Sequence, residues 1–341
     1  MATTAPGPRE GTVGIKQVAK AAGVSPGTVS NVLNRPERVA PATRERVEEA
    51  IRALGFVRNG SASSLRAGVG RLVGLMVHDL ANPFFSSLAR GVEDLMSERG
   101  YAVILCSSAT STDREHRNLR MLAEQGVRGV LVTPVDSGGP DALALLYERG
   151  IAAVMLDHAA TRPQQCSVTV DDVAGGQMAV THLLEAGARD IAYVSGPLTL
   201  RQCADRRAGA RKAVELAGHG AIRDVTVGDM TPASGQEAAD RLLAELPDAI
   251  FCANDLLAMG VMRTLLRQGV RVPERVLVIG YDDIEYATAS AVQLSSVRQP
   301  TYRLGRIAAE LLLDECDDPE GHAHQQILFQ PELVVRESTR Q

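Results

Sequence analysis

Residues 15–34 read IKQVAKAAGVSPGTVSNVLN, and this stretch predicts two short helices joined by a tight turn. Apolar side chains recur with the i, i+3, i+4, i+7 spacing of one helix face, at Ile15, Val18, Ala19 and Ala22. Gly23 suits the end of this helix, because glycine readily adopts the left-handed conformation found there. Ser25 and Pro26 suit the start of the second helix, where serine caps free N–H groups and proline loses no hydrogen bond.

The second helix has an apolar face and a small polar face. The predicted inward side chains are Val29, Val32 and Leu33, and the predicted outward residues are Gly27, Thr28, Ser30, Asn31 and Asn34. A third helix should begin near Pro41 and end before Gly55, with inward side chains at Val47, Ala50, Ile51 and Leu54. This arrangement is typical of a helix-turn-helix, whose Asn, Ser and Thr side chains suit hydrogen bonds to base edges. A three-helix module for protein interaction is the alternative.

The charge distribution favours a nucleic-acid partner for this region. The chain of 341 residues has a formal net charge of −5. Residues 12–68 hold nine basic and four acidic residues and carry +5, whereas residues 69–341 carry −10. A small cationic module on a large anionic body is expected when only the module meets phosphate, although a solvated basic domain would have the same charge.

The head resembles that of the LacI/GalR family of bacterial transcription regulators. The resemblance covers residues 15–34 and continues through Thr43-Arg44-Glu45-Arg46-Val47 to Leu54-Gly55-Phe56. It implies that the head contacts double-stranded operator DNA through Ser25, Pro26, Gly27, Thr28, Ser30, Asn31 and Asn34.

Residues 59–66 resemble the hinge helix of this family, which folds when two copies meet on the operator. A helix of this length is marginal in water. The resemblance implies DNA contacts from Asn59, Ala62 and Leu65, with Leu65 wedged into the minor groove. Gly60 stands where alanine is common and should cost this helix roughly 0.8–1 kcal/mol.

The rest of the chain alternates short apolar runs with amphipathic stretches. The first four predicted strands are 72–77, 102–105, 129–133 and 153–156, and four more follow at 191–195, 225–227, 249–252 and 276–279. The expected fold class is α/β, with an all-α helix-turn-helix head and two doubly wound α/β lobes. Ligands bind such sheets at the carboxyl ends of the strands. The polar pairs that follow four of these runs are therefore candidates for a cleft: His78-Asp79, Asp157-His158, Asn254-Asp255 and Asp282-Asp283.

The body also resembles the LacI/GalR family, whose regulatory core is similar to type 1 periplasmic binding proteins and holds an effector between its lobes. Matching motifs include Asn82-Pro83-Phe84-Phe85, Ala253-Asn254-Asp255, Gly280-Tyr281-Asp282-Asp283 and Val297-Arg298-Gln299-Pro300. The candidate effector-binding residues are Asp79, Phe84, Phe85, Asp157, Arg206, Met230, Asn254, Asp282 and Gln299. Met230 stands where members often stack an aromatic ring, so the site should have an adaptable apolar wall. The polar residues of the set suit a polyhydroxylated small molecule.

The expected domain organisation follows from these patterns. Residues 1–11 should form a disordered tail, 12–58 the head, 59–68 the hinge helix and 69–341 the effector-binding and dimerisation domain. Within this domain we expect an N-lobe of about 69–167 and 297–322, and a C-lobe of about 168–296 and 323–337.

Other functional classes find little support in the sequence. The five cysteines are widely spaced without a C-x-x-C pair, which argues against a disulfide framework and a zinc site. His322 and His324 lie in a glycine-containing loop, and at most weak surface metal affinity is expected there. No catalytic motif, cofactor fingerprint, signal peptide or membrane span is evident, so we expect a cytoplasmic protein without a cofactor or an enzymatic activity.

Three functions fit an α/β body with a cleft. A solute-binding protein for transport would have no use for the head, and an enzyme on a sugar or nucleotide would need a catalytic constellation. The head joined to the body favours a DNA-binding transcription regulator, most simply a repressor. It should act as a homodimer on a palindromic operator, with a tetramer as a further possibility, and a small-molecule effector should control it.

Overall fold

The computed structural model describes residues 13–56, 70–135, 141–160 and 162–340, and it divides into two compact units, 1–70 and 71–341. The predicted tail, at 1–11, and the predicted hinge helix, with Asn59, Ala62 and Leu65, lie outside the described residues.

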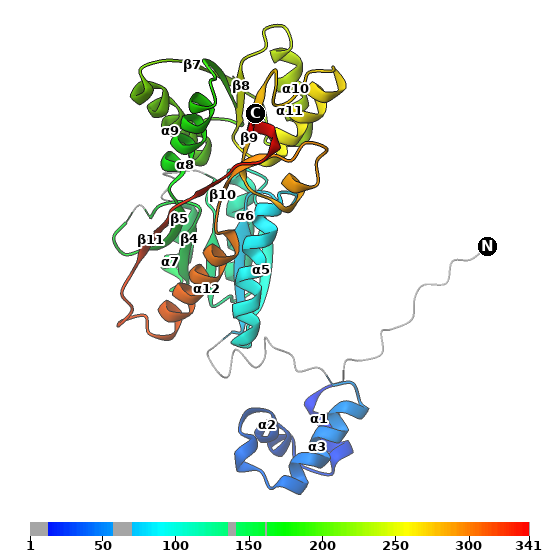
Figure 1. Ribbon diagram of the computed structural model, residues 1–341. Helices are drawn as coiled ribbons and strands as arrows, with labels where there is room; N and C mark the ends of the chain where they lie inside the picture. Colours follow the sequence, from blue (N-terminus) through cyan, green and yellow to red (C-terminus); the bar gives the residue numbers. More distant parts are fainter. Residues whose placement is uncertain (1–12, 57–69, 136–140, 161, 341) are drawn as a thin grey trace, which may run out of the picture. The chain divides into compact units, whose positions relative to one another are not determined.

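The head is a bundle of short helices around a small apolar core (Figure 1). Its elements are α1 (Ile15–Ala22), α2 (Pro26–Asn34), η1 (Pro36–Arg38) and α3 (Pro41–Ala53). Gly23 ends α1 in the left-handed region with φ +65°, and the Ser25 side chain caps α2 by accepting a bond from Thr28 N at 3.1 Å. The buried core residues are Val18, Ala19, Ala22, Val29, Val32, Val47 and Ala50. Leu54 was expected to point inward but is 36% exposed, because α3 ends one residue earlier.

The body contains two six-stranded sheets with the same strand order. The N-lobe sheet runs β2-β1-β3-β4-β5-β11 and the C-lobe sheet runs β7-β6-β8-β9-β10-β12. The N-lobe strands are β1 (Leu72–Val77), β2 (Ala102–Ser107), β3 (Gly129–Val132), β4 (Ala152–Leu156), β5 (Cys166–Val170) and β11 (Gln326–Phe329). The C-lobe strands are β6 (Asp190–Ser195), β7 (Ala221–Thr226), β8 (Ala249–Cys252), β9 (Leu277–Asp282), β10 (Ser295–Arg298) and β12 (Glu332–Val334). Strand β12 pairs antiparallel with β10, whereas the other paired strands are parallel.

Helices cover both sheets. The N-lobe helices are α5 (Pro83–Glu98), α6 (Thr112–Glu124), α7 (Asp141–Glu148) and α12 (Thr301–Asp317). The C-lobe elements are α8 (Asp172–Glu185), α9 (Arg201–Ala217), α10 (Pro232–Leu242), α11 (Asp255–Arg267), η2 (Glu285–Thr288) and η3 (Glu337–Thr339). Among the helices that the structure describes, we find none with the length and apolar composition needed to cross a bilayer.

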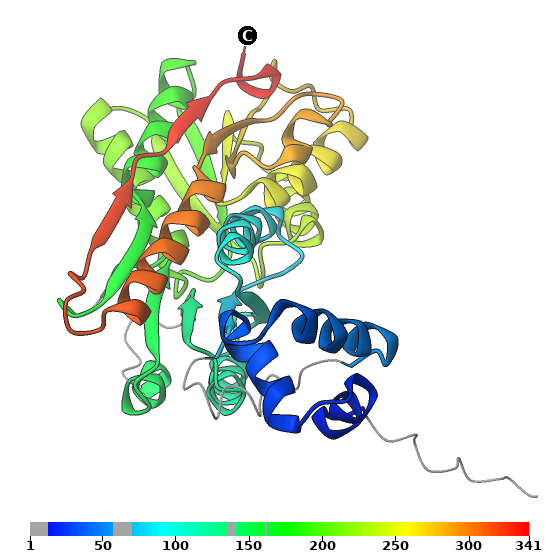
Figure 2. The same ribbon diagram turned by 90° about the horizontal axis from the view of Figure 1, so that it is seen from below.

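The chain passes between the lobes three times (Figures 1 and 2). The crossings lie between β5 and α8, between β10 and α12, and between β11 and β12.

Two expected lobe boundaries are therefore a few residues early, because β5 in the N-lobe extends to Val170 and β10 in the C-lobe extends to Arg298. The third is wrong by more: residues 326–329 were assigned to the C-lobe, but they form β11 at the edge of the N-lobe sheet. The physical reason is that β5 would otherwise leave its backbone hydrogen-bonding groups unpaired at the edge of the N-lobe sheet. Strand β11 pairs with this edge in parallel, starting with Gln326 opposite Ser167.

The strand order determines where a ligand can be held. Each sheet reverses its direction of growth at its second strand, between β1 and β3 in the N-lobe and between β6 and β8 in the C-lobe. Side chains at the carboxyl ends of strands beside such a switch point form the usual ligand site of an open α/β sheet. The predicted fold, a helical head and two doubly wound α/β lobes, is confirmed.

Candidate functional site

The head presents the polar face of α2 to solvent. Ser25, Pro26, Gly27, Asn31 and Asn34 are exposed, and Thr28 and Ser30 are half-buried. The Asn34 amide donates to Ser30 O at 2.8 Å and to Ser30 Oγ at 3.2 Å. Ser25 Oγ lies 2.9 Å from Thr28 Oγ1 at the start of the helix. Six of the seven head residues predicted to contact DNA thus lie on α2 and Ser25 caps it, away from the buried Val29 and Val32.

Basic side chains lie on the elements that flank α2. Lys16 and Lys20 on α1 are exposed, as are Arg35 and Arg38 after α2. By contrast, Arg44 and Arg52 on α3 form ion pairs with glutamates of the same helix, at 3.7 Å and 2.7 Å. A helix with an exposed polar face and nearby cations suits contact with both phosphate and base edges.

A buried ion cluster lies in the C-lobe around Arg206. This guanidinium is 3% exposed, and its Nε donates to Asp172 Oδ1 at 2.8 Å. Its Nη1 donates to Ala253 O at 2.5 Å and lies 3.8 Å from Asp282 Oδ1. The guanidinium carbon also lies 3.7 Å from the centre of the Tyr281 ring. A buried charge needs such partners: Asp172 pairs directly with Arg206, and Asp282 lies beside it.

Close packing of α8 on α9 sets the position of Arg206. Asp172 is the first residue of α8, and Arg206 lies in the second turn of α9. A Cβ on Gly176 would lie 2.0 Å from Arg206 O, and a Cβ on Gly209 would lie 1.9 Å from Val173 O. Only glycine fits at either position, so the two backbones approach closely enough for Arg206 to reach Asp172.

Asp282 connects this cluster to the N-lobe. It ends β9 with φ +102°, and its Oδ1 accepts a hydrogen bond from Gln299 Nε2 at 2.8 Å. Burial raises the pKa of Asp282 to about 6, while Arg206, Gln299 and a hydrogen bond from Asn82 act to lower it. Asn82 precedes α5 of the N-lobe, and its side chain also accepts from Phe84 N at 3.0 Å.

The N-lobe side of this region combines aromatic rings and imidazoles. Phe84 and Phe85 are 4% and 5% exposed, and their rings meet edge to face at 5.0 Å. His78 packs against Phe85 with ring centres 5.9 Å apart. Burial and the nearby His158 lower the pKa of His78 to about 4, and burial also lowers the pKa of His158. Both imidazoles are therefore neutral near pH 7.

Several buried polar atoms near the strand ends have no hydrogen-bond partner within the described part of the chain. Four of them belong to side chains that are 5% exposed or less and follow β1, β3, β4 and β10: His78 Nδ1, Thr133 Oγ1, His158 Nε2 and Gln299 Oε1. A buried polar atom without a partner costs about 1–3 kcal/mol, and native proteins rarely leave several together. A polar ligand would supply the missing bonds.

The remaining predicted effector residues lie in different surroundings. Asp157 is half-buried with φ +51°, and burial, with Asp172 next in importance, raises its pKa. Asn254 caps α11 and donates to Met230 O at 3.2 Å. The Met230 sulfur lies 3.5 Å from Cys203 Sγ. Asp79 differs, because its carboxylate accepts from Ala81 N in its own loop at 2.9 Å.

Four residues of this region are absent from the candidate effector-binding residues, although the sequence named His78 and His158 in two of the polar pairs expected at the cleft. Asp172 pairs with Arg206, and Thr133 and His158 carry two of the unpaired atoms. His78 is a fourth, buried where Asp79 was selected. Their common signal in the sequence is a polar residue at the first or second position after a buried strand, which Asp79 and Asp157 share.

Comparisons with known proteins decide the family. Residues 14–59 match the model of bacterial regulatory proteins of the lacI family, and residues 180–339 match that of a periplasmic binding protein-like domain. The HTH-type transcriptional repressor PurR of Aliivibrio fischeri (strain MJ11) is 34% identical over 331 residues, covering 95% of this chain and 97% of the relative. The chain belongs to the LacI family of bacterial transcription regulators.

Solved structures of LacI-family and related regulators have the same fold. The lac repressor dimer bound to operator and the anti-inducer ONPF matches with a TM-score of 0.84 at 28% identity, covering 97% of this chain and all of that chain. The complex of the transcriptional regulator CelR with cellobiose matches with a TM-score of 0.70 at 34% identity, covering 96% and 99%. As a LacI-family member, the chain is a DNA-binding transcription regulator and not an enzyme, as its sequence predicted.

Proposed function

We propose that this LacI-family protein is a repressor that binds an inverted-repeat operator as a homodimer. In this proposal, the polar face of α2 reads bases in the major groove, and each head covers one half-site. The exposure of Asn31 and the neighbouring cations support this role for the helix. The similarity to a lac repressor dimer on its operator supports the symmetry.

We further propose that a sugar or a related uncharged, polyhydroxylated metabolite binds at the facing strand ends of the two lobes. The single observation that carries this proposal is the group of four buried, unpaired atoms on His78, Thr133, His158 and Gln299. They offer several hydrogen-bond positions and carry no charge themselves, because both imidazoles are neutral, and the nearby Arg206 cation is paired with Asp172. Hydroxyl groups both donate and accept, so they suit this mixed set. The CelR structure, which holds cellobiose, supports a sugar in particular.

Asp282 is the most direct test of this site. We expect Asp282→Asn to weaken effector binding by roughly 10- to 100-fold, since hydrogen bonds to a charged group contribute about 1.5–3 kcal/mol. The measurement is thermal unfolding of the full chain in the presence of a panel of pentoses, hexoses, disaccharides and nucleobases, followed by calorimetry on each compound that raises the melting temperature.

Asp224→Asn provides a matched control, because Asp224 forms ion pairs with Arg207 and Arg211 away from the Arg206 cluster. This variant should bind the effector as the wild type does. Equal effector affinity for Asp282→Asn and wild type would show that the effector binds elsewhere. If nucleobases are the only compounds of the panel that bind, and Asp282→Asn weakens their binding, the proposed site is correct but the proposal of a sugar is wrong.

A further inference from the structure

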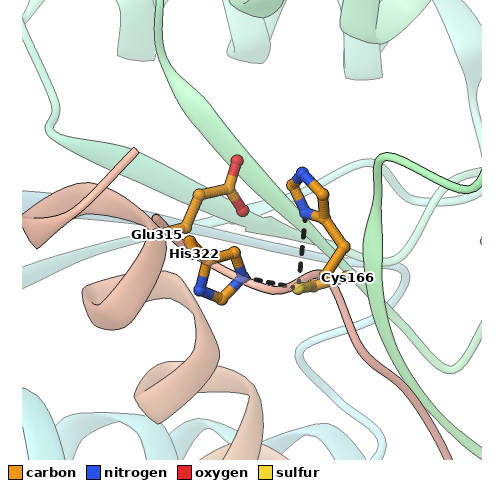
Figure 3. A group of neighbouring side chains, drawn as sticks. Cys166, Glu315 and His322 are labelled. Atoms are coloured by element: carbon orange, nitrogen blue, oxygen red, sulfur yellow. Dashed lines mark hydrogen bonds between the residues drawn. The ribbon is translucent and has the colours of Figure 1, made fainter. Parts of the chain in front are cut away.

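A cluster of four potential metal ligands lies in the N-lobe, outside the predicted DNA and effector sites. Cys166 begins β5, Glu315 lies in the last turn of α12, and His322 and His324 lie between α12 and β11. One ligand atom from each residue lies within 4.8 Å of the other three. Figure 3 shows Cys166, Glu315 and His322 converging on one point.

The distances around the Cys166 sulfur match those of a tetrahedral zinc site. The sulfur lies 3.1 Å from His322 Nε2 and 3.8 Å from His324 Nδ1. Ligand bonds of 2.3 Å to sulfur and 2.0–2.1 Å to nitrogen place these two atoms about 3.6 Å apart in a tetrahedron. The two observed distances bracket this value, so small side-chain rotations would bring both nitrogens to ligand distance.

Two features of the surroundings also point to a cation. Glu315 Oε2 is buried and has no hydrogen-bond partner among the described residues. The Cys166 sulfur accepts a hydrogen bond from the backbone N–H of Gln325 at 3.3 Å, a contact that would stabilise a thiolate. One thiolate, one carboxylate and two neutral imidazoles sum to −2, which a divalent cation neutralises in a partly buried site.

The local fold holds the four residues in place without a metal. The turn after α12 is closed by Gly321 N and His322 N, which donate to the side chain and the backbone oxygen of Asp318. Ser167 N donates to Gln325 O at 2.9 Å and joins the start of β5 to the segment before β11. Such preorganisation reduces the entropy lost on binding.

We propose that Cys166, Glu315, His322 and His324 bind one Zn²⁺ ion, which fastens the α12–β11 connection to the edge of the N-lobe sheet. The donor set of sulfur, nitrogen and oxygen is typical of zinc, whereas magnesium and calcium prefer oxygen alone. Cys166 is the first residue of β5, so the proposed zinc site lies at the amino end of this strand. The effector site is proposed at the opposite, carboxyl ends of the strands. The sequence argued against a zinc site because its cysteines are widely spaced without a C-x-x-C pair, and only weak metal affinity was expected at His322 and His324. Cys166 and His322 are 156 positions apart, so no short ligand spacing marks the site.

Metal titration of the full chain tests the proposal. After removal of metal with a chelator, Co²⁺ should bind with one-to-one stoichiometry and produce the visible bands of tetrahedral cobalt together with a thiolate charge-transfer band. Zn²⁺ should displace it and raise the melting temperature by several degrees. Cys166→Ser should abolish the charge-transfer band, and His322→Ala should weaken Co²⁺ and Zn²⁺ binding by more than ~10-fold.

Matched controls are His219→Ala, a histidine exposed after α9, and Cys106→Ser, a buried cysteine on β2. Both should bind Co²⁺ as the wild type does. His322 is only half-buried, so its alanine variant remains informative if Cys166→Ser fails to fold. Absence of stoichiometric Co²⁺ or Zn²⁺ binding would overturn the proposal. Metal binding that is unchanged in His322→Ala would also overturn it, because the ion would then lie elsewhere.

Discussion

His78 makes folding stability depend on pH. Its pKa is about 4 in the folded protein and 6.5 in the unfolded chain, so the unfolded state binds more protons between these values. Stability should therefore fall as pH decreases through this window, by about 2 kcal/mol between pH 7 and pH 5. Asp282 acts in the opposite direction, because its pKa of about 6 means that the folded state binds the extra proton there.

A comparison of variants isolates the contribution of His78. We expect the free energy of unfolding in urea to fall less between pH 7 and pH 5 in His78→Gln than in the wild type. The difference should be about 2 kcal/mol. His219→Gln serves as the control, since it replaces an exposed histidine. An equal decrease in wild type and His78→Gln would show that His78 is not held neutral by burial.

Part of the candidate site could be predicted from the sequence. The family resemblance selected Arg206, Asp282 and Gln299, and these three are buried and in contact or close to one another. The choice between neighbouring polar residues could not be made in the same way. His78 and Asp79 both follow β1, and only the packing of Phe85 shows that His78 is the buried one. Where β1 ends thus decides which side chain enters the site.

At the level of secondary-structure elements, glycine contacts control helix packing. The pair α5 and α12 repeats the arrangement of α8 and α9: a Cβ on Gly91 would lie 2.1 Å from Tyr302 O, and one on Gly305 would lie 2.1 Å from Leu88 O. Contacts this short involve rigid backbone and cannot be relieved by side-chain rotation. A methyl group at such a position must therefore move a whole helix.

Gly176→Ala should consequently displace α9 and Arg206 with it. We expect the free energy of unfolding to fall by more than about 2 kcal/mol. The energetic cost of the steric overlap should exceed the ~1 kcal/mol that alanine gains over glycine in helix propensity. Gly228→Ala is the control, since a Cβ there has nothing within 4 Å. Urea unfolding of the two variants makes the comparison. Equal stability of both would contradict the packing argument.

The elements differed in how well they could be predicted. Strands β1, β3, β4 and β8 are continuous apolar runs with buried backbones, and their predicted positions agree with the structure within one residue. No strand predicted from the sequence corresponds to β5, β10, β11 or β12. Strand β10 reads SSVR and is buried through hydrogen bonds, such as that of Ser296 Oγ to Asp255, rather than through apolar side chains. Strand β11 is an edge strand whose pairing depends on β5, far away in the sequence.

At the scale of the whole molecule, the proposed function requires two heads. One head is too small to cover more than a half-site, so we expect a dimer in which each α2 enters its own major groove. Sedimentation equilibrium of the full chain at micromolar concentration should give twice the monomer mass of 36.3 kDa. A monomer that still binds a single half-site with full affinity would contradict this assembly.

The central claim is that the polar face of α2 reads a specific DNA sequence. Selection of bound fragments from a random DNA library, with the full chain and with Asn31→Ala, tests it most directly. The wild type should enrich an inverted repeat. Asn31→Ala should lose base preference at one position in each half-site, equivalent to roughly 1–3 kcal/mol, and keep the rest of the motif. The claim is contradicted if the wild type enriches no motif, or if the motif of Asn31→Ala is identical to that of the wild type.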